Sequence, residues 1–182
     1  MAKITDPRDR RFVLFDQLKV QELNKYEKFK DYDHETFEMV ISEAEKFAGN
    51  TLWNINPTGD EEGCTFKDGE VKTPEGFKQA YDQYVEGGWI TPADDPEWGG
   101  QGLPQSVSTA CHESFHGANS AFSNYPNLTH GAGILIYKHG TEEQKQKYLT
   151  RLWSGEWAGT MCLTEPGAGS DLGILKTKAL PQ

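Results

Sequence analysis

The chain has 182 residues, 36% of them hydrophobic, and a formal net charge of −10 from 28 acidic and 18 basic residues. Its length fits about one ordinary domain, enough to bury a core without disulfides or metal. The acidic balance lacks the positive field that nucleic acids attract, so we expect no nucleic-acid partner. No apolar run approaches the about 20 residues of a membrane-spanning helix, so we expect no membrane insertion.

The first residues and the cysteines indicate the compartment. Residues 1–12 are charged and precede no apolar stretch, which argues against a signal peptide. Cys64, Cys111 and Cys162 are odd in number, widely spaced and without a C-x-x-C pair. They support neither a disulfide framework nor a zinc ribbon. We therefore expect a reducing, cytoplasmic location.

Helix signals dominate residues 1–155. Asp6 and Pro7 are typical of a helix start, as a capping side chain followed by a first-turn proline. Asp33 or His34 precedes a stronger helix, whose apolar residues recur at spacings of three and four. Residues 54–73 combine proline, glycines and acids, which predicts a surface loop.

Four more helices are predicted before the character of the chain changes. Thr141, followed by two glutamates, is typical of a helix N-terminus, where acids interact favourably with the helix dipole. The four predicted helices span, approximately, residues 73–87, 104–122, 129–140 and 141–153.

At Gly155 the pattern becomes that of a β region. Residues 157–164 and 172–179 are predicted strands, and residues 165–171 are a turn between them. Two strands cannot bury both faces of a sheet. They either form a hairpin on the helices or begin something longer, and we favour the second interpretation.

His112, Glu113 and His116 form an H-E-x-x-H sequence. On a helix, two histidines four residues apart reach one zinc ion, and the glutamate activates the water bound to it. The longer motif, with a glycine and a third histidine downstream, is absent: Gly117 follows His116 directly, and His130 falls at the wrong spacing. The pattern leaves two alternatives, a zinc metallopeptidase or a chance match on an ordinary helix.

Residues 167–173 read Gly-Ala-Gly-Ser-Asp-Leu-Gly. A Rossmann fingerprint requires a small residue where Leu172 stands and a helix after it, and a P-loop requires Gly-Lys-Ser/Thr. What remains is a glycine-rich turn whose N–H groups and Ser170 hydroxyl can approach a phosphate. The alternative is a plain tight turn.

Two further features are less specific. The acids 60–62 could hold a cation or form a solvated loop. The aromatic-rich residues 115–137 could line an apolar ligand channel or pack in the core.

Residues 161–171, Met-Cys-Leu-Thr-Glu-Pro-Gly-Ala-Gly-Ser-Asp, closely resemble the signature of acyl-CoA dehydrogenases. Residues 140–145 resemble the helix before that signature, and residues 96–102 resemble the family's P-E-x-G-G-x-G turn. Residues 6–18 and 86–104 are similar to the large bacterial subgroup that includes the 3-methylmercaptopropionyl-CoA dehydrogenases.

The resemblance implies a mainly α fold. Residues 1–155 would form the helical N-terminal domain, and residues 156–182 would begin the β-barrel middle domain, which is cut after its first strands. The family's catalytic glutamate belongs to a C-terminal helical bundle that this chain lacks. The resemblance therefore implies no catalytic residue in this chain and no activity of the chain alone.

The resemblance also implies FAD as cofactor and α,β-desaturation of an acyl-CoA thioester as the reaction. Met161 and Leu163, through backbone groups, and the Thr164 hydroxyl would face the flavin ring. Gly169 and Ser170 would lie near the FAD pyrophosphate, and Ser170 also near the acyl-CoA. Met161 departs from the aromatic residue common in the family, but a backbone contact there would survive.

The partners implied are the acyl-CoA substrate, an electron-transfer flavoprotein or similar electron acceptor, and further copies of the chain in a homo-oligomer. A non-catalytic scaffold relative, with the redox half lost, is the remaining alternative.

Overall fold

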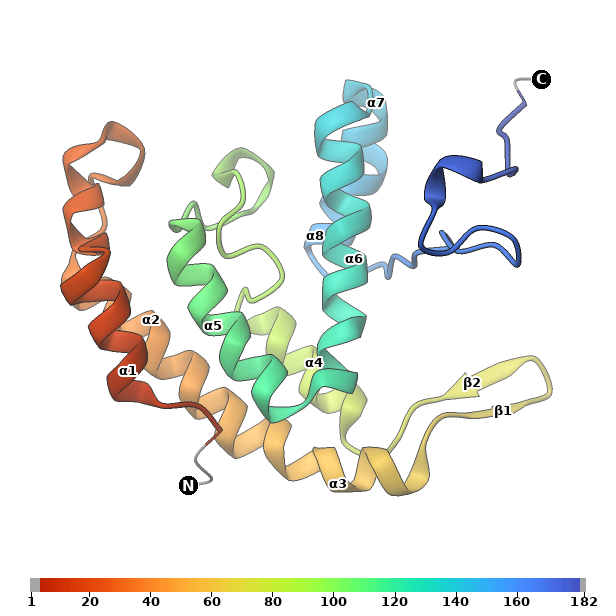
Figure 1. Ribbon diagram of the computed structural model, residues 1–182, viewed down its shortest axis with the longest axis horizontal. Coiled ribbons are helices and arrows are strands. Elements are labelled where there is room, and N and C mark those ends of the chain that lie inside the picture. Colours follow the sequence, from red (N-terminus) through yellow and green to blue (C-terminus); the bar gives the residue numbers. More distant parts are fainter. Residues whose placement is uncertain (1–3, 181–182) are drawn as a thin grey trace.

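The computed structural model describes residues 4–180, and helices form most of it (Figure 1). The predicted domain limits include residues 1–3 and 181–182, which lie outside the described residues. The mainly α class is confirmed. The α-helices are α1 (Pro7–Arg11), α2 (His34–Phe47), α3 (Trp53–Glu62), α4 (Phe77–Glu86), α5 (Gln105–Ala118), α6 (Ser120–His139), α7 (Glu142–Gln144) and α8 (Thr150–Trp153).

Shorter or wider helical turns connect these helices. The π-helical turns are Phe12–Gln17, Ala48–Leu52 and Lys145–Leu149. The 3-10 turns are Val20–Lys25, Glu27–Phe29, Pro96–Trp98 and Leu172–Ile174.

Capping residues set several helix starts, as predicted. The Asp6 carboxylate accepts hydrogen bonds from two N–H groups in the first turn of α1. The Asp33 carboxylate accepts one from Thr36 N at the start of α2. Thr141 and Gln144 exchange side chain–backbone hydrogen bonds, a capping box that begins α7.

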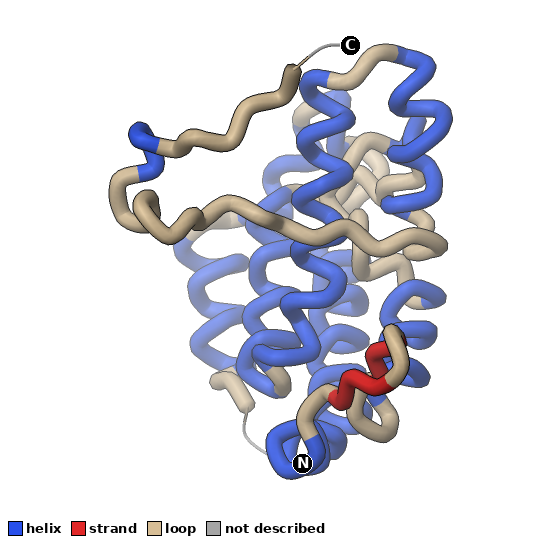
Figure 2. The backbone as a smooth tube through the Cα atoms, turned by 90° about the vertical axis from the view of Figure 1, so that its right-hand side faces the viewer, coloured by secondary structure: helices blue, strands red, loops and turns tan. Residues whose placement is uncertain are grey.

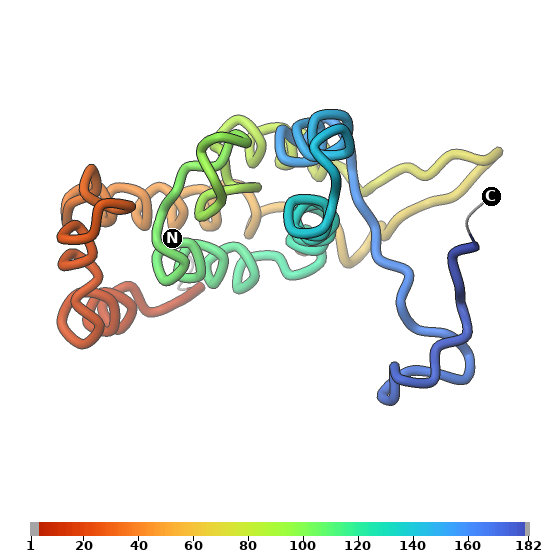
Figure 3. The backbone as a smooth tube through the Cα atoms, turned by 90° about the horizontal axis from the view of Figure 1, so that it is seen from above, coloured from red at the N-terminus to blue at the C-terminus, as the bar shows by residue number. Residues whose placement is uncertain are grey.

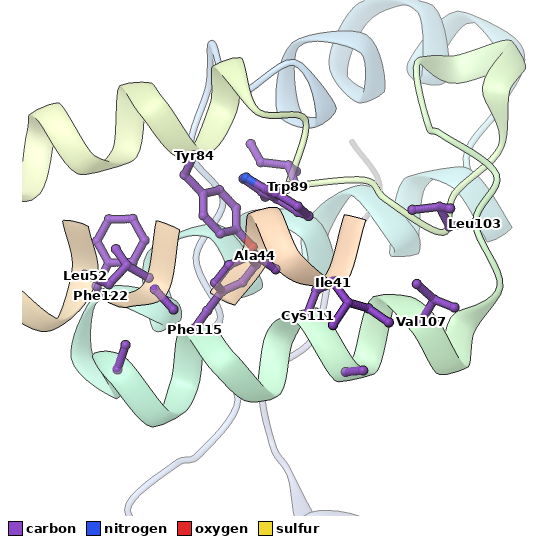
Figure 4. Packing of buried hydrophobic residues seen from close by; sticks show 14 of the residues in the cluster. Ile41, Ala44, Leu52, Tyr84, Trp89, Leu103, Val107, Cys111, Phe115 and Phe122 are labelled. Atoms are coloured by element: carbon purple, nitrogen blue, oxygen red, sulfur yellow. The ribbon is translucent and has the colours of Figure 1, made fainter. Parts of the chain in front are cut away.

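The core lies between α2, α4 and α5 (Figure 4). Phe115 of α5 is buried and packs edge-on against two aromatic rings: Tyr84 of α4 at 5.3 Å and Trp89 at 5.2 Å between ring centroids. Ile41 of α2 and Val107 of α5 are fully buried beside them. Edge-to-face packing of this kind adds to the stability that apolar burial supplies.

The charged start of the chain is part of this packing. Arg10 of α1 is only 5% exposed. Its Nη1 lies 2.7 Å from Glu45 of α2, and its Nε lies 3.1 Å from Glu113 of α5. A buried cation without such partners would be costly, so the two carboxylates and the arginine hold α1 against both helices.

The predicted loop over 54–73 is wrong for its first half. The helix continues from α2 into α3 and passes through Pro57. Leu52 is fully buried and Ile55 packs against the core, so tertiary packing outweighs the unfavourable helix propensity of this stretch. Gly63, with φ of +62°, follows the last residue of α3. The acids 60–62 thus end a helix instead of forming a loop.

A hairpin follows. Strands β1 (Thr65–Lys67) and β2 (Glu70–Lys72) pair antiparallel, with Phe66 opposite Val71. The hairpin projects away from the helices on the same side as the C-terminal segment (Figures 1 and 3). Helix α4 begins at Phe77, later than predicted, after Gly76 with φ of +83°.

The predicted break between residues 122 and 129 is also wrong. Helix α6 passes through Pro126, and the break falls at Asn119 instead. The Asn119 side chain accepts a hydrogen bond from Phe122 N at 2.9 Å and donates one to Leu52 O at 3.3 Å. One buried amide therefore caps α6 and ties it to the last residue of the π-helical turn Ala48–Leu52, between α2 and α3.

The chain leaves the helices after Gly155 and runs along one side of the molecule (Figure 2). The expected strands 157–164 and 172–179 are not formed here. Residues 157–164 have no partner strand among residues 4–180, and residues 172–174 form a 3-10 turn. A strand without a neighbour cannot make its ladder of hydrogen bonds, so these residues stay irregular.

Candidate functional site

The residues expected to contact a cofactor lie on one segment of the chain, and all five are exposed. Met161 is 65% and Leu163 is 41% exposed. Thr164, Gly169 and Ser170 are exposed as well. The structure thus leaves all five available to a ligand or to another part of a larger protein, and their assignment as contacts stays a prediction.

The turn within this segment is closed by Glu165. Its backbone exchanges two hydrogen bonds of 3.0 Å with Ala168. Its carboxylate accepts hydrogen bonds from Lys176 N at 2.9 Å, from Thr177 N at 2.8 Å and from the Thr177 hydroxyl. The Thr177 hydroxyl is the largest of the influences that lower the pKa of Glu165. Residues 165–177 therefore form a closed loop.

Gly167 and Gly169 of this loop face open space. A Cβ atom on Gly167 would meet no atom within 4 Å, and one on Gly169 would meet only Thr164 Cγ2 at 3.8 Å. Neither glycine has a positive φ. Within residues 4–180, the N–H groups of Gly167, Gly169 and Ser170 donate no hydrogen bond. Glycine is not required here by the chain itself, and the unpaired N–H groups suit an anionic ligand that approaches closely.

A pocket of about 750 Å³ adjoins the segment. Its walls come from α4, α6 and residues 155–160, and Thr160 at its edge directly precedes Met161. Apolar walls with a few polar groups are typical of small-molecule sites. The principal side chains of the walls are Phe77, Tyr81, Phe122, Tyr125, Leu128 and Thr129.

Helix α6 contacts the residues that precede the signature. The Thr129 hydroxyl accepts a hydrogen bond from Gly159 N at 3.1 Å and donates one to Tyr125 O at 2.9 Å. A Cβ on Gly159 would lie 2.6 Å from the Cβ of Ala132, so only glycine allows this close approach. The sequence pattern identified Thr129 only as a helix start and gave no signal for its contact with Gly159.

Tyr125 carries a polar group at the pocket wall. Its hydroxyl lies 3.4 Å from Sγ of Cys64, the residue directly before strand β1. The hydrogen bond with Cys64, followed by partial burial, raises the pKa of Tyr125 to about 12. The hydroxyl is therefore neutral at physiological pH, when it can donate a hydrogen bond.

The aromatic segment 115–137 divides between its two interpretations. Tyr125 and Leu128 line the pocket, Phe115 packs in the core, and Phe122 does both. Tyr137 instead donates a hydrogen bond to the Asp95 carboxylate at 2.9 Å, which attaches the loop 91–103 to α6.

The H-E-x-x-H residues have separate partners. His112 Nε2 lies 3.2 Å from Tyr84 Oη, and His116 Nε2 lies 2.7 Å from Asn127 Nδ2. Glu113 is paired with the buried arginine of α1, and burial is the main cause that lowers the pKa of His112. In the described part of the chain, no three histidine, cysteine, aspartate or glutamate residues gather as a metal site. The ordinary-helix interpretation is therefore favoured over a zinc peptidase.

Comparison with known proteins gives the class to which this fold and segment belong. The family model described as "Acyl-CoA dehydrogenase, N-terminal domain" matches residues 34–156. The chain is 41% identical over 143 residues to 3-methylmercaptopropionyl-CoA dehydrogenase of Ruegeria pomeroyi, covering 79% of this chain and 24% of that protein. The chain belongs to the acyl-CoA dehydrogenase family.

Two other relatives match almost the whole chain. The broad-specificity linear acyl-CoA dehydrogenase FadE5 of Mycobacterium tuberculosis is 36% identical over 179 residues, which are 96% of this chain and 29% of that protein. A butyryl-CoA dehydrogenase of Syntrophomonas wolfei is 33% identical, with the same shares of 96% and 29%. The chain spans less than a third of the length of these relatives. Among residues 4–180, no helix is long and apolar enough to cross a membrane.

Proposed function

We propose that these residues form the N-terminal part of a flavin-dependent dehydrogenase that desaturates an acyl-CoA thioester between its α and β carbons. The observation that carries the proposal is the glycine-rich loop 165–171, with open glycines and unpaired N–H groups. An apolar pocket whose lining ends at Thr160, just ahead of this loop in the chain, supports it. Family membership supplies the class of reaction. In this proposal residues 1–155 form the helical domain, and residues 156–182 begin the β domain.

The loop fits the phosphates of FAD and of acyl-CoA. Gly169 and Ser170 offer N–H groups and a hydroxyl without steric obstruction, which suits a pyrophosphate. Met161 and Leu163, through backbone groups, and the Thr164 hydroxyl would face the flavin ring. Ser170 would also contact the acyl-CoA. FAD, when bound, supplies the hydride acceptor of the desaturation.

The pocket fits the apolar portion of the ligands. Phe77, Phe122 and Leu128 would exclude water, and the neutral Tyr125 hydroxyl would offer a hydrogen bond at the wall. Thr129 would keep the segment before the signature in place through its bond to Gly159. The role proposed for this chain is thus to bind and orient, and none of its residues is proposed as the base that removes the α-proton.

The same proposal covers the activity of the chain alone and the location and partners of the protein. We expect the chain alone to be inactive, and the complete protein to be a cytoplasmic homo-oligomer that passes electrons to an electron-transfer flavoprotein or a similar acceptor. The scaffold alternative is less favoured, because the loop keeps its glycines open for a ligand.

Gly169→Val tests the proposal in protein expressed from its complete reading frame. Valine would fill the space that the phosphates are expected to occupy, and we expect FAD affinity to fall at least about tenfold. Equilibrium dialysis with FAD, followed by turnover with acyl-CoA and an artificial electron acceptor, measures the effect. Gly131→Ala, on the exposed face of α6, is the control. Unchanged FAD affinity in Gly169→Val, or turnover by residues 1–182 alone, would contradict the proposal.

A further inference from the structure

We propose that Glu165 is a positioning residue: its carboxylate fastens residues 176–177 to the signature turn and so holds the loop open for the ligand phosphates before they bind. This inference rests on the proposed function, since the phosphates come from FAD or acyl-CoA. Glu165 itself would contact neither ligand.

The contacts of Glu165 join two parts of the segment twelve residues apart. Oε2 accepts the Lys176 N–H, and Oε1 accepts both the N–H and the hydroxyl of Thr177. Between these anchors lie Gly167, Gly169 and Ser170, whose N–H groups are unpaired within the described residues. The loop is therefore closed by contacts among its own residues.

A further hydrogen bond lies within the same loop. Asp171 accepts a hydrogen bond from Gly173 N at 3.0 Å and begins the turn Leu172–Ile174. With the paired backbones of Glu165 and Ala168, it places Gly169 and Ser170 between two hydrogen-bonded turns. A binding loop that is already ordered loses less conformational entropy when its ligand arrives, and so binds it more tightly.

The contacts require a carboxylate in particular. Three donors share its two oxygens, an arrangement that an ionised acid satisfies and an amide does not. In Glu165→Gln one oxygen becomes an NH₂ group, which would face an N–H donor and lose that hydrogen bond. Thr177→Val removes only the hydroxyl contact, and Thr177→Ser keeps it.

The test uses protein from the complete reading frame, with FAD as the probe. We expect Glu165→Gln to weaken FAD binding about tenfold or more. Thr177→Val should weaken it less, and Thr177→Ser should retain the wild-type dissociation constant. Hydrogen exchange at the amides of residues 176 and 177, measured without FAD, should accelerate in Glu165→Gln. Thermal unfolding of the helices should stay unchanged, because the loop lies outside their core.

Glu143→Gln is the matched control, since it removes an exposed carboxylate of α7 from a site remote in sequence. If wild-type protein binds FAD and Glu165→Gln matches Glu143→Gln in affinity and exchange, the positioning role is wrong while the proposed function stands. If wild-type protein binds no FAD, the proposed function is wrong and the positioning role falls with it. If Thr177→Ser weakens binding as much as Thr177→Val, the hydroxyl contact has no part in positioning.

Discussion

Thr129 and Gly159 are joined by a hydrogen bond of 3.1 Å that connects α6 to the residues immediately before the signature. Thr129 is fully buried, and its hydroxyl also donates to the Tyr125 carbonyl in the preceding turn. The Thr129 side chain thus connects helix α6 to the segment that follows Gly155 and holds Gly159 against the helix.

Thr129→Val should loosen this connection. Valine has nearly the same shape but cannot accept the Gly159 N–H, so we expect a loss of about 1 kcal/mol in the free energy of unfolding. Urea unfolding followed by circular dichroism measures the loss. Thr129→Ser keeps the hydroxyl and should retain most of the stability. Equal stability of Thr129→Val and the wild type would show that the hydrogen bond contributes nothing.

Replacing either of two glycines of α6 by alanine should change the stability of the fold, in opposite directions for the two positions. A Cβ on Gly131 meets nothing within 4 Å, whereas one on Gly133 would lie 2.1 Å from Nε1 of the buried Trp153. Gly131→Ala should stabilise by about 0.5–1 kcal/mol through helix propensity. Gly133→Ala should destabilise by about 1–3 kcal/mol through overpacking. Chemical denaturation of both variants checks this, and Gly133→Ala at least as stable as Gly131→Ala would contradict it.

His112 should make stability depend on pH in mildly acidic solution. Burial lowers its pKa in the folded chain below the ordinary value, so it stays neutral where the unfolded chain is already protonated. Stability should therefore fall as the pH drops from about 6.5 towards the folded pKa, by at most about 1.4 kcal/mol per pH unit.

Unfolding titrations at several pH values between 5 and 7.5, compared with His112→Gln, test this assignment. The variant should show a flatter dependence on pH, and a substitution of the exposed His139 by glutamine should not. A wild-type slope that persists unchanged in His112→Gln would assign the dependence to other groups.

The three cysteines should divide into two classes of reactivity. Cys64 and Cys162 are exposed, whereas Cys111 is fully buried and burial raises its pKa to about 12. Because the thiolate is the reactive form, a thiol reagent at pH 8 should label two thiols rapidly and the third only after unfolding. Rapid labelling of all three in the native chain would place Cys111 outside the core.

Local chemistry allowed part of the fold to be predicted. The helix starts at Asp6, Asp33 and Thr141 follow from side chains that satisfy neighbouring N–H groups, which is information contained in a few consecutive residues. The helices through Pro57 and Pro126 could not be predicted in this way. They depend on packing against distant residues, as the buried Leu52 shows.

The candidate site was likewise predictable only where it depends on neighbouring residues in the sequence. The signature residues Met161 to Asp171 were recognisable because they are consecutive. The α6 wall of the pocket lies within residues 115–137, for which a ligand channel was one of the two interpretations. The walls from α4 and residues 155–160 had no local signal, since they depend on how α4 packs beside α6. The Thr129–Gly159 and Glu165–Thr177 contacts also join residues far apart in sequence and have no local signal.

We propose that these residues present a flavin and an acyl-CoA to each other, and the visible absorption spectrum of the purified protein is the decisive test. Protein purified from its complete reading frame should show the band of oxidised flavin, and the band should bleach when a mixture of acyl-CoA thioesters is added without oxygen. A protein that contains all its domains but carries no flavin, or whose flavin band no acyl-CoA changes, would contradict the account.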